Sequence, residues 1–198
     1  MNILSDSRLQ RTKSKNWPIG IGVALFLLTG MEITKSSFAD ELSVGLVTQD
    51  GTPFIIGNLD LGKTEMGYDY QLKLDETKFE EFFLNMRPFI CFQGPKHMLC
   101  HLPYLYDKGT HVSEADMLDL EYDLLFIHRR ATDYGIDPWN GLYYKLRLTE
   151  AGMAGMLHEV DLNILAAPPA ENVARPITDY DLHVADPDIH SYPTILIQ

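Results

Sequence analysis

Alternation of apolar and polar residues runs through much of the chain after residue 40 and predicts β-strands. Residues 42–61 contain two apolar stretches separated by Asp50-Gly51, which is a strong hairpin signal. Residues 68–74, with the sequence YDYQLKL, alternate strictly and predict a half-buried strand. Residues 142–149 and 157–165 alternate in the same way around an intervening turn segment. We therefore expect these last two to pair as neighbouring antiparallel strands.

A helical pattern interrupts these strands after Asp75, a residue type that favours the N-cap position. Four apolar residues then recur at helical spacing until Pro88 stops the pattern: Phe79, Phe82, Phe83 and Met86. The spacing predicts one amphipathic helix of about ten residues whose aromatic stripe packs on a sheet.

The middle of the chain predicts a second hairpin and a central strand. Residues 89–93 and 97–106 flank Gly94-Pro95, so we expect a hairpin that contains both cysteines. Ser113 is placed to cap a short helical turn through Asp116. Residues 120–128, LEYDLLFIH, become apolar on both faces toward their end, which is typical of a central strand.

The chain changes character from Pro168 onward, where prolines and scattered acidic residues predict an extended tail over residues 168–198. Its last residues, 194–198, predict an edge strand. Residues 40–167 are expected to form a single globular domain. The fold class that follows is mainly β or α+β: an antiparallel sheet or small barrel-like domain with one packed amphipathic helix and an extended C-terminal tail.

The first 39 residues have the order of a secretory signal peptide. Basic residues between Arg8 and Lys15 precede an uncharged run, and a short polar stretch ends at Ser37-Phe38-Ala39. The uncharged run is shorter than the roughly 20 residues of a permanent membrane helix. We expect cleavage after Ala39 and export to the periplasm or the medium; the alternative is an uncleaved helix that anchors the protein in the inner membrane.

Charge restricts the class of partner. The whole chain has a net charge of −12, and removal of residues 1–39 leaves 11 basic and 26 acidic residues, a net charge of −15. Such a field repels nucleic-acid backbones and anionic lipid surfaces, so neither is an expected partner. We expect a protein or small-molecule ligand of the cell envelope, and the charge is compatible with attraction of Ca²⁺ or of a cationic partner.

Cys91 and Cys100 are the only cysteines, and in an exported hairpin centred between Pro95 and Lys96 they face each other. We therefore predict a disulfide. A second hypothesis is a metal or redox protein that uses Cys91, His97, Cys100 and His101, although their spacing matches no standard zinc or haem site. No cofactor is expected from any sequence motif.

The segment 131–141, ATDYGIDPWNG, concentrates side chains suited to ligand binding. An exposed aromatic ring beside a carboxylate and an amide can stack on a sugar while polar groups bind its hydroxyls. The candidate binding residues are Tyr134, Asp137, Trp139 and Asn140. Alternatively, Asp133 and Asp137 form the acid/base pair of an envelope hydrolase, or the aromatic residues cover the sheet while the polar residues turn the chain.

Two histidines complete the set of candidates. His128 and His158 share the parity of apolar neighbours in predicted strands, and each is a possible base or pH sensor. The chain contains no nucleophile elbow, phosphate-binding glycine loop or zinc-protease motif. The sequence thus favours a non-enzymatic exported binding domain, with a hydrolase and a metal or redox protein as alternatives.

Overall fold

The computed structural model of the chain describes residues 40–198 except 85–86, 131, 171–172 and 174. The predicted signal peptide, residues 1–39, lies outside the described residues. No helix in the described part is long and apolar enough to cross a membrane. The elements are β1 (Asp40–Val47), β2 (Pro53–Lys63), β3 (Tyr68–Leu74), η1 (Glu76–Lys78), β4 (Glu80–Leu84), β5 (Arg87–Gln93), β6 (Met98–His101), β7 (His111–Val112), α1 (Leu118–Asp123), β8 (Phe126–Arg129), η2 (Pro138–Asn140), β9 (Gly141–Thr149), β10 (Gly152–Val160), η3 (Leu162–Leu165), η4 (Asp179–Asp181), β11 (His183–Val184) and β12 (Thr194–Ile197).

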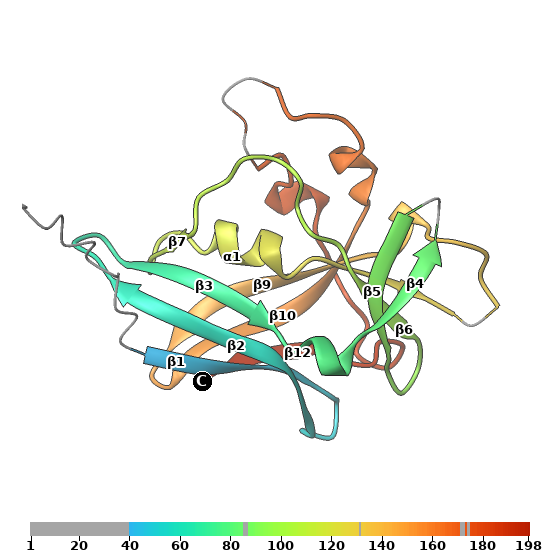
Figure 1. The fold of residues 1–198 in the computed structure, drawn as a ribbon, viewed down its shortest axis with the longest axis horizontal. Coiled ribbons are helices and arrows are strands. Elements are labelled where there is room, and N and C mark those ends of the chain that lie inside the picture. Colours follow the sequence, from blue (N-terminus) through green and yellow to red (C-terminus); the bar gives the residue numbers. More distant parts are fainter. Residues whose placement is uncertain (1–39, 85–86, 131, 171–172, 174) are drawn as a thin grey trace, which may run out of the picture. The chain divides into compact units, whose positions relative to one another are not determined.

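The strands form one 12-stranded sheet in the order β4-β5-β6-β8-β9-β10-β12-β1-β2-β3-β7, with β11 paired to β10 (Figure 1). Every pairing is antiparallel. Strands from both ends of this order contribute side chains to one core cluster, so the sheet coils around a shared interior. The predicted fold class, mainly β or α+β with a single helix, is confirmed.

Two predicted hairpins are present, and the second has the register expected from the sequence. In the first, Val47 pairs with Pro53, and the turn between them contains Gly51 at φ 86°, a conformation that glycine adopts without strain. In the second, Cys91 pairs directly with Cys100 across β5 and β6. The strand predicted at residues 68–74 is β3.

The helix predicted after Asp75 was wrong. The carboxylate of Asp75 does accept a hydrogen bond from the backbone N–H of Thr77, but the helical conformation ends after the 3-10 turn η1. The aromatic residues that follow form β4, where Phe82 pairs with Phe89 of β5. Phenylalanine favours strands, and the pairing of β4 with β5 gives these residues cross-strand contacts with side chains of β5.

The helix is instead α1, at residues where the sequence predicted the first half of a central strand. Before the helix, the carboxylate of Asp116 accepts a hydrogen bond from the backbone N–H of Leu118, the first residue of α1, at 2.9 Å. Leu120 and Leu124, one helical turn apart, are fully buried in the core cluster that contains the sheet interior. The predicted strand therefore begins only at Phe126, as β8.

Two further strands differ from expectation in position. β10 begins at Gly152, five residues before the predicted start at 157, and ends where Asp161 caps η3. β12 forms where a strand was expected, but it pairs with β10 on one side and β1 on the other. It is therefore a central strand, and not an edge strand.

Alternate residues of β5, β6, β8 and β9 supply two core clusters. On the inner face, Phe92, Leu99 and Phe126 join the cluster within the coiled sheet. On the outer face, Cys91 and Tyr143 join a second cluster, which Ile136, Leu162 and Ile177 cover from the connecting segments. The loops after β8 and β10 therefore pack as a layer on the outside of the sheet.

Candidate functional site

A cavity of about 570 Å³ opens between the start of β1, β2, β3, β7 and the turn that joins β9 to β10. Its apolar lining includes Leu61, Val112, Met117 and Met153, all of which are buried. The half-buried Tyr68 also lines it. A cavity of this size, with apolar walls, has the dimensions of a small-molecule site.

Carboxylates are the charged groups of this cavity. Asp40 and Glu41 contribute from β1, and Glu150 contributes from the β9–β10 turn. All three residues are exposed, and no lysine or arginine is among the described residues that line the cavity. An apolar cavity with an acidic rim favours a ligand that combines an apolar body with a positive charge.

The predicted binding residues at 134–140 lie at the other end of β9, just before Gly141. Tyr134 is fully exposed, and Trp139 is 69% exposed in the short helix η2. Asp137 caps η2, because its carboxylate accepts a hydrogen bond from the backbone N–H of Trp139 at 3.1 Å. Asn140 closes the same turn through its backbone N–H, which bonds to the carbonyl of Asp137 at 3.0 Å.

The neighbouring acid Asp133 also has local partners. Its carboxylate accepts hydrogen bonds from the backbone N–H of Arg130 at 2.7 Å and from the guanidinium of Arg130 at 3.2 Å. The hydrogen bond from that backbone N–H is the main reason why the pKa of Asp133 lies below its usual value. A depressed pKa opposes the general-acid role that one of the two carboxylates would need in a hydrolase.

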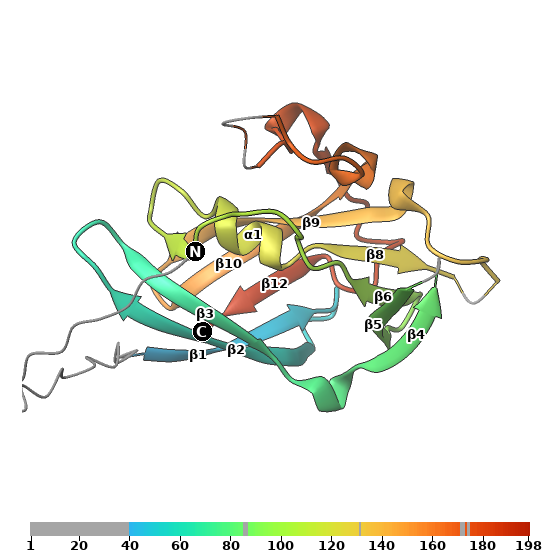
Figure 2. The same ribbon diagram turned by 45° about the horizontal axis from the view of Figure 1, so that its top comes forward.

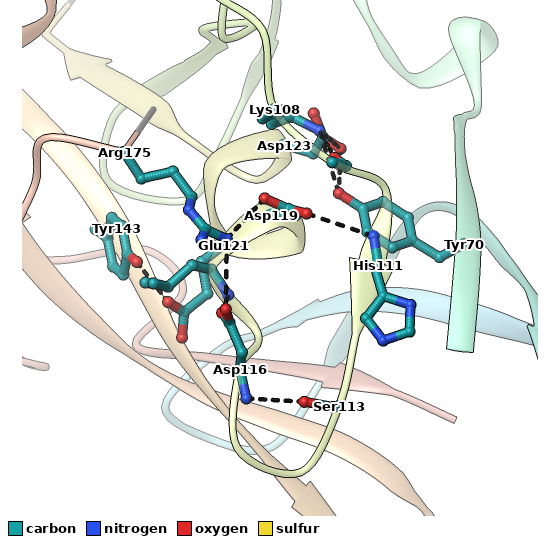
Figure 3. A network of polar contacts seen from close by, with 12 residues as sticks. Tyr70, Lys108, His111, Ser113, Asp116, Asp119, Glu121, Asp123, Tyr143 and Arg175 are labelled. Carbon is teal, nitrogen blue, oxygen red and sulfur yellow. Dashed lines mark hydrogen bonds and ion pairs between the residues drawn. The ribbon is translucent and has the colours of Figure 1, made fainter. Parts of the chain in front are cut away.

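A network of polar contacts surrounds α1 (Figure 3). Asp123 accepts hydrogen bonds from the Tyr70 hydroxyl at 2.6 Å and from Lys108 Nζ at 2.7 Å. One helical turn before Asp123, Asp119 pairs with Arg175 at 2.8 Å. These contacts connect α1 to β3, to the segment before β7 and to the C-terminal segment, so they fix the helix in place.

Glu121 is the most deeply buried acid of this network. Its carboxylate accepts hydrogen bonds from the Tyr143 hydroxyl and from the backbone N–H of Leu146, the latter at 2.6 Å. β8 pairs with β9 only as far as Leu142, so α1 occupies the edge of β9 beyond that point (Figure 2). Glu121 thus satisfies a strand N–H that has no neighbouring strand.

Burial raises the pKa of Glu121, while its bonds to Tyr143 and Leu146 and the charge of Lys145 act in the opposite direction. A cleft of about 410 Å³ passes beside Glu121, Tyr143 and Lys145. Because both carboxylate oxygens of Glu121 already accept bonds from the protein, the group functions as a structural acceptor.

Cys91 and Cys100 form the predicted disulfide. The thiolates that a cysteine metal site needs are therefore absent, and His101 donates from Nε2 to the backbone carbonyl of Asp123 at 2.8 Å. Within the residues that the structure describes, no three His, Cys, Asp or Glu side chains are arranged to hold a metal ion. No protein-family model, curated protein or solved structure matches this chain.

Sequence reasoning missed both the cavity and the Glu121 network. The cavity has no local signature, because its lining comes from segments that are as far apart as β1 and the β9–β10 turn. Glu121 did leave a signal: it lies among the apolar residues that precede β8, where a charged side chain requires buried partners.

Proposed function

We propose that this protein is an exported, non-enzymatic binding domain that takes a small amphipathic cation into the cavity between β1, β7 and the β9–β10 turn. The observation that carries the proposal is the cavity of about 570 Å³, with buried apolar walls and a rim of Asp40, Glu41 and Glu150. Apolar walls favour the hydrocarbon part of a ligand, and the carboxylates favour its positive charge.

The disulfide supports the exported part of this proposal, since cystines persist in oxidising compartments. The net charge of −15 expected after cleavage at Ala39 supports the choice of a cation, because the field of the whole domain attracts positive ligands. Expression of the full chain, followed by mass determination of the exported product, is expected to give a protein that begins at Asp40.

The binding test compares three amphiphiles with the same ten-carbon chain, all below their micelle concentrations: decyltrimethylammonium, decyl sulfate and decyl maltoside. Calorimetric titration is expected to show the cation binding at least about tenfold more tightly than the sulfate, since the acidic rim repels the latter. Equal affinity for all three, or preference for the sulfate, contradicts the proposal.

Two matched variants locate the site. Leu148 lines the cavity and is 41% exposed, whereas Ile55 lies on β2, is 42% exposed and does not line it. Leu148→Lys places a positive charge at the cavity and is expected to lower the affinity for the cation by about tenfold or more. Ile55→Lys makes the same change of chemistry elsewhere and is expected to leave the affinity unchanged.

Segment 134–140 is a second candidate surface, because Trp139 is exposed beside an apolar pocket of about 190 Å³ that Ile136 and Pro138 help to line. The chain has two tryptophans, Trp17 and Trp139, so Trp139 is the single fluorophore of its kind after cleavage. Its fluorescence is expected to stay constant during the titration. Quenching of Trp139 fluorescence that follows the binding curve would show that the ligand binds at this second surface and not in the cavity.

A further inference from the structure

Three histidines from distant parts of the chain meet at one point. His97 lies in the turn between β5 and β6, His128 lies on β8, and His190 lies between β11 and β12. Their ring centroids are 4.8 Å apart for His97 and His128, 5.4 Å for His97 and His190, and 5.2 Å for His128 and His190. His97 and His190 are only 6% and 1% exposed. We call this group the histidine cluster.

The cluster lies where residues 186–191, which we call the C-terminal strap, contact the β5–β6 turn. Lys96 Nζ donates to the backbone carbonyls of Pro187 at 3.1 Å and Asp188 at 2.8 Å. The Ser191 hydroxyl oxygen accepts from the backbone N–H of Lys96 at 3.0 Å and from that of His97 at 3.4 Å. The strap leads directly into β12, so these contacts fix the entry of that central strand.

Few groups near the cluster can neutralise added protons. Glu159 of β10 accepts a hydrogen bond from His190 Nε2 at 2.7 Å and so compensates one positive charge. Nε2 of His97 and Nδ1 of His190 are buried and have no hydrogen-bond partner among the residues that the structure describes. The other charged groups that act on the cluster are Lys96 of the turn, Arg130 after β8 and Asp133 of the following loop.

We propose that the histidine cluster is an acid-sensitive latch, in which neutral imidazoles hold the C-terminal strap on the β5–β6 turn and protonation releases it. The proposal is independent of the ligand cavity. Three imidazoles in mutual contact cannot all carry a charge when a single carboxylate is hydrogen-bonded to them, so the docked strap is compatible with fewer protons than the released one.

The direction of the pH effect follows from the two states. Burial, followed by the charges of His128 and His190, lowers the pKa of His97 from 6.5 to about 4, and burial also lowers the pKa of His128. With the strap released, His97 binds its proton as the pH falls through 6.5, whereas His97 beneath the docked strap resists until about pH 4. Acidification between these values therefore favours release, and an exported protein is exposed to such changes of external pH.

The experiment measures hydrogen exchange of the full chain's exported product at pH 7.5 and pH 4.5, with labelling times scaled to the intrinsic exchange rates. The backbone N–H groups of Lys96 and His97, which donate to the Ser191 hydroxyl oxygen, report on the docking of the strap. Relative to the β9–β10 hairpin, their protection is expected to fall by at least about tenfold at the lower pH. Equal loss in the strap and in the hairpin overturns the proposal.

His128→Gln removes one titrating ring at a half-buried position and is expected to reduce the pH-dependent loss of protection to less than about threefold. His190→Gln, which keeps an amide donor for Glu159, is the second variant if the first does not fold. His158→Gln, on β10 outside the cluster, is expected to retain the wild-type response. An unchanged response to pH in both cluster variants overturns the latch. A second outcome also overturns it: zinc chloride at pH 7.5 increases the protection of the wild-type strap, and His128→Gln abolishes that increase. The cluster would then be a metal site.

Discussion

The buried Tyr143 hydroxyl holds the Glu121 carboxylate, which in turn takes the place of a strand partner for the backbone N–H of Leu146. Tyr143 donates its hydroxyl hydrogen to the carboxylate, and both side chains are almost completely buried. A buried carboxylate depends on such donors, because water is not available to replace them. The bond therefore contributes to the attachment of α1 to β9.

Tyr143→Phe removes that donor while it keeps the ring, and we expect it to lower the free energy of unfolding by about 1.5–3 kcal/mol. The loss of the donor also raises the pKa of Glu121 further. A carboxyl whose folded pKa is raised stabilises the fold at low pH, and this stability is lost as the pH rises through the folded pKa. The decrease in the free energy of unfolding that Tyr143→Phe causes is therefore larger at pH 7 than at pH 4.

Urea denaturation at these two pH values measures the effect, with Tyr180→Phe as the matched control because Tyr180 is 96% exposed. The control is expected to unfold within about 0.5 kcal/mol of the wild type at both values. A Tyr143→Phe protein as stable as this control would show that the hydroxyl does not support the helix.

At the scale of elements, the sequence predicted strands more reliably than the helix. The period-2 pattern of β3 has one interpretation, whereas Phe79, Phe82 and Phe83 have helical spacing but belong to a residue type that favours strands. Tertiary contacts decide between them: Phe79 packs edge-on against Phe92 at 5.4 Å, and Phe82 packs against the outer cluster. Such contacts cannot be derived from local periodicity.

The same limit applies to the candidate sites. Segment 131–141 could be selected from its composition, because aromatic and polar residues are adjacent in the sequence. The cavity beside the β9–β10 turn could not, since Tyr68, Val112 and Glu150 meet only after the sheet has coiled. The histidine cluster could be predicted only in part. His97 and His128 were each candidate residues in the sequence, but no sequence pattern related either of them to His190.

The β5–β6 hairpin provides a prediction at this scale. In the chain-entropy model, a disulfide that closes a loop as short as that between Cys91 and Cys100 stabilises the fold by about 2.5–3 kcal/mol. Cys91→Ala combined with Cys100→Ala should lower the free energy of unfolding by at least that amount, because both buried sulfurs are also lost from the outer cluster.

Urea denaturation again provides the measurement, and wild-type protein with the disulfide reduced is the control that keeps both sulfurs. We expect the reduced protein to lie between the oxidised protein and the double variant. If reduction left the unfolding midpoint where it was, the covalent link would contribute nothing and the chain-entropy argument would be wrong for this hairpin.

For the whole molecule, β12 determines whether the sheet is continuous. It lies between β10 and β1, so it joins the part of the sheet made of β4, β5, β6, β8, β9 and β10 to the part made of β1, β2, β3 and β7 (Figure 1). Its inward residues Ile195 and Ile197 are fully buried in the core within the coiled sheet. Both halves of the sheet thus depend on β12 for their connection.

Deletion of residues 194–198 is expected to abolish the cooperative thermal unfolding transition, since it leaves the facing edges of β1 and β10 unpaired and removes two large core side chains. Leu196→Lys is the control, because Leu196 is 37% exposed and its substitution keeps the backbone pairing. That variant is expected to unfold cooperatively and within about 1 kcal/mol of the wild type. A truncated protein that still melts in one sharp transition would mean that the two halves of the sheet fold without the strand between them, and the continuous sheet would then not be the unit of stability.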